Sequence, residues 1–107
     1  MESKFAVDLK DGVAQIQLSG NLDTMTAPTL QEELKKLAGA PIKSLVFLAK
    51  ELEYISSAGL RVIIFAKQKI GANAQVYLIG AGESIISVIK MSGLDNFMHI
   101  QETFSEQ

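Results

Sequence analysis

Short apolar runs that alternate with longer amphipathic stretches constrain the fold of this chain most. Residues 45–48 form a continuous apolar run, residues 75–79 form a second, largely apolar run, and the stretch 57–70 between them is long enough for a helix. A continuous apolar run of this length is typical of a strand buried on both faces of a sheet. A strand, a helix and a further strand in this order predict two parallel strands joined by a right-handed crossover. The central part of the chain therefore predicts an α/β fold.

The N-terminal part predicts an antiparallel pair of strands. Apolar and polar residues alternate over residues 5–9 and again over residues 14–18. The dipeptide Asp11-Gly12 between these segments is a strong hairpin signal, because both residue types accept the backbone conformation of a tight turn. The first two strands are therefore expected to pair with each other.

Two further helices and a last strand complete the pattern. Thr24 or Thr26 is expected to cap a helix that carries Pro28 in its first turn. Apolar residues at helical spacing over 85–91 predict another helix, and residues 97–100 predict a short edge strand. The expected order is ββαβαβα with a short final strand, which gives a mixed β-sheet with helices packed against it.

Composition excludes several classes of function. The length of 107 residues predicts a single domain, 1–107, and the net charge of −2 gives no reason to expect a nucleic-acid partner. The absence of cysteine excludes a disulfide framework and a thiolate metal site. The N-terminus lacks the apolar core of a signal peptide, and no apolar run approaches the roughly 18 residues of a membrane span. We therefore expect a cytoplasmic protein with no membrane insertion, no metal and no cofactor.

The run Tyr54-Ile55-Ser56-Ser57-Ala58-Gly59-Leu60-Arg61 carries most of the functional information. It places two serines and a glycine where a strand is expected to end and a helix to begin. The start of a helix has unpaired backbone N–H groups and the positive end of the helix dipole. A serine at this point can cap the helix, act as a nucleophile or carry a phosphate.

The sequence offers little support for catalysis. The one histidine, His99, lies on the expected edge strand, and the pattern Gly-x-Ser-x-Gly is absent because Ile55 stands two residues before Ser57. Glu51 and Glu53 are interpreted as solvated side chains at a strand end, with no acid–base partner nearby in the sequence. We expect no catalytic residues and no enzyme, and a nucleophilic Ser57 is the third of three hypotheses.

Capping and phosphorylation both fit the turn. Ser56 and Ser57 are each suitable N-cap residues. Gly59 in the first turn costs about 1 kcal/mol relative to alanine, and it allows close approach of the backbone. A phosphate would add about −1.5 to −2 charges and three acceptor oxygens, which a helix N-terminus tolerates. The fold could thus survive phosphorylation while the surface potential changes sharply, as a reversible switch requires.

With these features in place, the chain resembles the STAS domain family, and within it the stand-alone bacterial anti-sigma factor antagonists. The resemblance runs from about Phe5 to Phe104. It is carried by the order of strands and helices, by Gly20-Asn21-Leu22-Asp23, by the turn at residues 54–60 and by Met91-Ser92-Gly93-Leu94. It implies a STAS-like mixed sheet and a regulatory function.

The resemblance also implies a switch. In the family this turn reads Asp-Ser-Ser/Thr/Ala-Gly-Leu, and the first serine after the aspartate is phosphorylated; that serine corresponds to Ser57, with Ser56 as the second candidate. The unphosphorylated domain is expected to bind an anti-sigma factor that is also a serine kinase, and a metal-dependent phosphoserine phosphatase is expected to reset it. The expected partner-binding residues are Asn21, Asp23, Thr24, Ser56, Ser57, Ala58, Gly59 and Arg61.

Two departures from the family pattern support a second hypothesis. Ser56 replaces the aspartate that precedes the phosphorylated serine, and Leu48 stands where the preceding strand often carries aspartate or asparagine. These changes affect the polar part of the partner surface. The alternative function is therefore a non-switching STAS interaction subunit of a transporter or of a larger signalling complex.

Overall fold

A five-stranded sheet forms the centre of the computed structural model, which describes residues 3–104. The strands lie in the order β1-β2-β3-β4-β5; β1 pairs antiparallel with β2, and the other neighbours pair parallel. Their bounds are Lys4–Lys10, Val13–Leu22, Ser44–Ile55, Gln75–Ile79 and His99–Gln101. The mixed sheet and the order of elements confirm the fold expected from the sequence.

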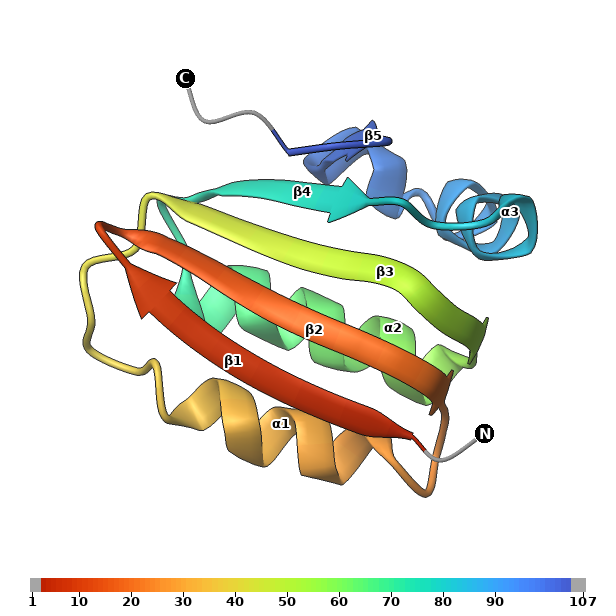
Figure 1. Cartoon of the computed structure of the whole chain (residues 1–107), viewed down its shortest axis with the longest axis horizontal. Coiled ribbons are helices and arrows are strands. Elements are labelled where there is room, and N and C mark those ends of the chain that lie inside the picture. Colours follow the sequence, from red (N-terminus) through yellow and green to blue (C-terminus); the bar gives the residue numbers. More distant parts are fainter. Residues whose placement is uncertain (1–2, 105–107) are drawn as a thin grey trace.

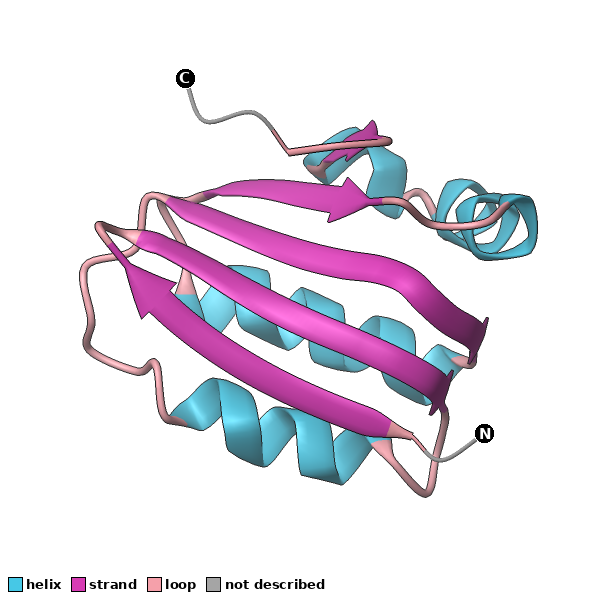
Figure 2. Ribbon diagram, viewed as in Figure 1, coloured by secondary structure: helices cyan, strands magenta, loops and turns pink. Residues whose placement is uncertain are grey.

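The helices are distributed unevenly about this sheet. Helix α1 (Ala27–Lys35) and helix α2 (Ser57–Phe65) lie against the same face, whereas α3 (Glu83–Ser92) lies beyond the end of β4 (Figure 1). A π-helical turn, η1 (Ala66–Ile70), extends α2, and a 3₁₀ turn, η2 (Leu94–Phe97), precedes β5. Within residues 3–104, no helix crosses the face of the sheet that is turned to the viewer in Figure 2.

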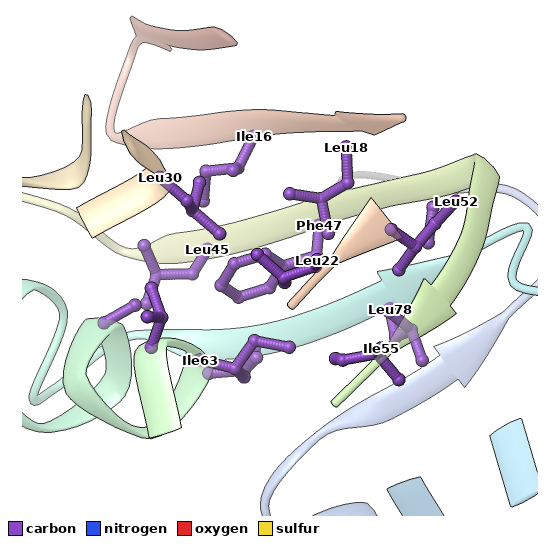
Figure 3. Packing of buried hydrophobic residues seen from close by; sticks show 14 of the residues in the cluster. Ile16, Leu18, Leu22, Leu30, Leu45, Phe47, Leu52, Ile55, Ile63 and Leu78 are labelled. Atoms are coloured by element: carbon purple, nitrogen blue, oxygen red, sulfur yellow. The ribbon is translucent and has the colours of Figure 1, made fainter. Parts of the chain in front are cut away.

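The main core lies between the sheet and the two helices α1 and α2. Phe47 of β3 is fully buried at its centre, together with Ile16 and Leu22 of β2 and Leu30 of α1 (Figure 3). Each such side chain contributes about 1.5–3 kcal/mol by leaving water. The sheet and the helices therefore hold each other in one arrangement.

A smaller cluster occupies the opposite face. Val46 is fully buried there beside Val13 and Ile79, although no helix within residues 3–104 covers them. Tyr77 and Phe104 pack against this cluster, with their ring centroids 4.9 Å apart in an edge-to-face arrangement. Burial on both faces at residues 45–47 confirms the interpretation of this run as a central strand.

Two strands are longer than the sequence pattern indicates. The apolar–polar alternation of the second strand ends at residue 18, but β2 continues through Gly20 to Leu22. β3 likewise continues past residue 48 to Ile55, and the two extensions pair with each other, Leu22 opposite Ile55, with irregularities in the register. The exposed residues Lys50 and Glu51 end the apolar run, so the local pattern carries no strand signal beyond it.

The end of the second helix agrees with expectation. The helical segment that begins at Ser57 ends at Ile70, where the N–H of Gly71 donates to the carbonyl of Ala66 at 2.9 Å. This wide turn closes the segment before β4.

No helix within residues 3–104 is long and apolar enough to cross a membrane.

Gly59 sets the distance between α2 and the ends of β2 and β3. A β-carbon at this position would lie 2.7 Å from Cγ of Leu22, 2.8 Å from Cγ1 of Ile55 and 2.8 Å from the carbonyl oxygen of Leu22. One of these contacts is with backbone, which cannot move aside as a side-chain end can. The absence of a side chain therefore lets the first turn of α2 lie directly on the two strand ends.

We expect Gly59→Ala to lower the free energy of unfolding by about 1–3 kcal/mol, the usual cost of overpacking a filled site. Alanine favours the helix by about 1 kcal/mol over glycine, so a net loss shows that the steric term is larger. Urea unfolding followed by circular dichroism measures the change as a lower midpoint at unchanged slope.

Gly82→Ala is the matched control for this substitution. A β-carbon on Gly82 meets no atom within 4 Å, and its φ of −73° suits alanine. Alanine is a poorer N-cap residue than glycine, but it also reduces the conformational freedom of the unfolded chain. These two effects oppose each other, so we expect Gly82→Ala to change the free energy of unfolding by less than about 0.5 kcal/mol. Unchanged or increased stability of Gly59→Ala would contradict the close packing of α2.

Candidate functional site

The candidate site lies where β2 and β3 end side by side. Parallel pairing brings Asn21 opposite Tyr54 and Leu22 opposite Ile55, so the two following loops leave the same edge of the sheet. The N–H of Ser56 donates to the carbonyl of Leu22 at 2.9 Å and ties the second loop to the first. The segments at residues 20–23 and 54–61, far apart in the sequence, are therefore neighbours.

The loop from β2 to α1 is held by Asp23 and Thr26. One carboxylate oxygen of Asp23 accepts from the N–H groups of Met25 and Thr26, at 3.0 and 3.1 Å. The hydroxyl of Thr26 accepts from the N–H of Asp23 at 2.9 Å and donates to the carbonyl of Asn21 at 2.7 Å. Asp23 therefore fixes the shape of the loop. Thr26 occupies the N-cap position of α1, but its hydroxyl turns back to this loop and not to the helix.

The two serines at the start of α2 have different environments. Ser56 has extended backbone and occupies the N-cap position, where its hydroxyl accepts from the N–H of Gly59 in a long hydrogen bond of 3.5 Å. Ser57 is the first residue of the helix and is exposed. Among residues 3–104, the structure gives the Ser57 hydroxyl no hydrogen-bond partner. Because Ser56 takes the cap, the Ser57 hydroxyl is available to another molecule.

The other expected site residues lie at different depths. Asn21, Thr24 and Arg61 are exposed, whereas Asp23, Ser56 and Ala58 are half-buried. Gly59 is buried against Leu22 and Ile55 and supports the surface from below. The structure thus brings these residues to one face, and it leaves the three exposed side chains and Ser57 outermost.

Two large apolar side chains near this turn, which the sequence pattern did not indicate as partner-binding residues, are exposed. Met25 is 85% exposed in the loop before α1, and Tyr54 is 53% exposed near the end of β3. Methionine and tyrosine are enriched in protein–protein interfaces relative to the rest of the surface. The sequence carried no signal for Met25, since exposure depends on how the loop turns.

A hollow of about 470 Å³ lies beside the turn, between α1 and α2. Thr24 and Pro28 line it from the first loop and helix, and Ala58 and Arg61 line it from α2. Glu32 also faces it, but its carboxylate is paired with Lys35 at 2.9 Å. Arg61 makes no ion pair with any residue in the range 3–104. A cation without an ion pair in this range therefore lies one helical turn after Ser57.

His99, the histidine that could serve as a base, lies far from Ser57. His99 lies on β5, where Nε2 is 3.0 Å from Oε1 of Gln75 and the ring stacks near Tyr77. Ser57 follows the far end of β3, so the imidazole does not reach its hydroxyl. Over residues 3–104, no three side chains of metal-ligating type gather at one point.

Leu48 lies away from the turn. It pairs with Gln17 and Ile79 in the middle of β3 and packs against the cluster on the open face of the sheet. Its replacement of a polar residue therefore affects the open face and not the surface around Ser57.

Comparison with known proteins identifies the family of this fold. The model of the STAS domain matches residues 4–107. The anti-sigma-F factor antagonist RsfB of Mycobacterium tuberculosis is 25% identical over 96 residues, which cover 90% of this chain and 79% of the relative. Its name describes a regulator of another protein and not an enzyme.

Solved structures agree with this assignment. An anti-sigma factor antagonist from Mycobacterium paratuberculosis superposes with a TM-score of 0.83 at 24% identity, over 96% of this chain and 88% of the other. The Bacillus cell fate determinant SpoIIAA in its phosphorylated form superposes with a TM-score of 0.71 at 16% identity, over 91% and 90%. From its sequence and its fold, this chain belongs to the STAS domain family.

Proposed function

We propose that this chain is an anti-sigma factor antagonist, which binds an anti-sigma factor through the face around Ser57 and is switched off by phosphorylation of Ser57. The observation that carries the proposal is the division of roles between the two serines. Ser56 caps α2, whereas the Ser57 hydroxyl is exposed and has no hydrogen-bond partner among residues 3–104. Similarity to RsfB, an antagonist of an anti-sigma factor, supports the class of partner.

The switch follows from the position of Ser57. The partner's kinase activity transfers the γ-phosphoryl group of ATP to Oγ of Ser57, the hydroxyl loses its proton, and ADP leaves. The phosphate then lies at the first helical residue, where the unpaired N–H groups and the helix dipole stabilise an anion. The fold therefore survives, while the contact face gains about −1.5 to −2 charges that repel the partner. A phosphatase then hydrolyses the phosphoserine with water, which restores the hydroxyl and releases inorganic phosphate. We place both reactions in the cytoplasm.

We expect the cognate kinase and ATP to phosphorylate the chain at Ser57 alone. Mass spectrometry of a proteolytic digest measures the modified residue. Ser57→Ala should abolish the modification and Ser57→Asp should weaken anti-sigma factor binding at least tenfold, because the carboxylate supplies part of the phosphate charge.

Ser56→Ala is the matched control. It removes the cap and lowers the free energy of unfolding by about 0.5–2 kcal/mol, but phosphorylation of Ser57 should persist. Modification at Ser56, or unaltered binding by Ser57→Asp, would contradict the switch. Purification of the chain with a membrane transporter ATPase in place of a soluble kinase would favour the non-switching interaction subunit.

A second prediction concerns the apolar part of the contact face. We expect Met25→Ala and Tyr54→Ala each to weaken anti-sigma factor binding about 5- to 30-fold, since exposed apolar side chains at the centre of an interface supply much of its energy. Isothermal titration calorimetry of the unphosphorylated chain measures the loss. Both side chains lie outside the core, so the unfolding midpoint should change little.

Met91→Ala provides a matched control, because Met91 is as exposed as Met25 (86% against 85%) but lies at the end of α3. Its removal should leave the affinity unchanged. Equal losses from Met25→Ala and Met91→Ala would place the contact face elsewhere.

A further inference from the structure

Arg61 follows Ser57 by four residues on the same helix. Residues i and i+4 are neighbours on a helix surface, and a helical side chain leans toward the N-terminus of its helix. From this geometry we expect the Arg61 side chain to reach the turn that begins with Ser57. An anion that precedes a cation by four residues is the favourable order for such a pair.

The guanidinium of Arg61 is free to take a new partner. Both Arg61 and Ser57 are exposed, and no ion pair to Arg61 exists within the described range 3–104. The two carboxylates of the neighbouring loop and helix are engaged, Glu32 with Lys35 and Asp23 with its own loop. Within residues 3–104, both of these carboxylates near Arg61 therefore already have partners.

We propose that Arg61 is the internal counter-ion of a phosphate on Ser57, and that this pair withdraws Arg61 from the partner surface. The guanidinium presents a planar fork of N–H donors that matches phosphate oxygens in a bidentate contact. A phosphate at residue 57 thus receives donors from two sides, the N-terminal N–H groups of α2 and the Arg61 side chain.

The pair gives phosphorylation a second effect on the complex. In the unphosphorylated chain, Arg61 lines the hollow between α1 and α2 and offers a cation to an acidic group of the partner. In the phosphorylated chain, the same cation is occupied by the phosphate. The surface therefore gains an anion and loses an available cation in one step. This inference rests on the proposed phosphorylation of Ser57, but the pairing can be tested without the kinase.

The first experiment uses the full chain with phosphoserine incorporated genetically at position 57, so its outcome does not depend on whether a kinase exists. A ³¹P NMR titration measures the second pKa of the phosphoserine, which is about 6 in the absence of partners. We expect Arg61→Gln to raise this pKa by about 0.3–0.7 pH unit, a two- to fivefold change in proton affinity, because the dianion loses its counter-ion. Arg61→Lys should give an intermediate value, since an ammonium group lacks the bidentate fork.

Lys90→Gln is the control, because it removes the same charge from an exposed position on α3. It should leave the phosphoserine pKa within about 0.1 pH unit of the parent chain, which separates a local pair from a general charge effect. An equal pKa in the Arg61→Gln and parent chains would overturn the counter-ion role.

The second experiment tests the withdrawal of Arg61 from the partner. Isothermal titration calorimetry of the unphosphorylated Arg61→Gln chain with the anti-sigma factor should show about three- to tenfold weaker binding, while Lys90→Gln binds as the parent does. Unchanged affinity of unphosphorylated Arg61→Gln would overturn the withdrawal. If the kinase assay leaves Ser57 unmodified while Arg61→Gln still raises the phosphoserine pKa, the proposed function fails and the Arg61 pair stands.

Discussion

The parallel ladder between β2 and β3 is the feature on which the rest of the site depends. It continues past the end of β4 to Leu22 and Ile55, and it ends with the hydrogen bond from Ser56 N–H to the Leu22 carbonyl. Both functional loops leave from this end. A ladder that stopped at residue 48 would leave the second loop without this anchor, and the two halves of the site would not meet.

Close packing at the same point gives α2 a fixed start. Gly59 lies against Leu22 and Ile55 with no room for a β-carbon, so the first turn of the helix rests on the strand ends. Ser56 then caps the helix, and Ser57 is turned outward one residue later. The exposed hydroxyl and the buried glycine are two results of one constraint: the backbone of α2 approaches the sheet more closely than a side chain would permit. A switch placed here can be modified without disturbing the core beneath it.

Much of the fold could be predicted from local patterns. Alternation over residues 5–9 and 14–18, the apolar runs at 45–48 and 75–79, and the helical spacing at 85–91 each indicated the correct type of element. The extensions of β2 and β3 could not be predicted, because Gly20 and the exposed Glu51 weaken the local strand pattern. These extensions are held by pairing between the two strands. At the site, the exposure of Met25 and the absence of an ion pair to Arg61 within residues 3–104 were likewise beyond the sequence pattern. Both depend on contacts between residues that are distant in the chain.

The sequence by itself determined the order of the elements and the chemistry available at the turn: two serines, a glycine and an arginine at a helix start, with one histidine on another strand. Those properties follow from apolar periodicity and residue type, which act over a few residues. The tertiary structure alone decided which serine caps the helix, how deeply Gly59 is buried, and that residues 20–23 and 54–61 share one face. These depend on the pairing of β2 with β3 and on the packing of α2, because burial and exposure are set by neighbours in space.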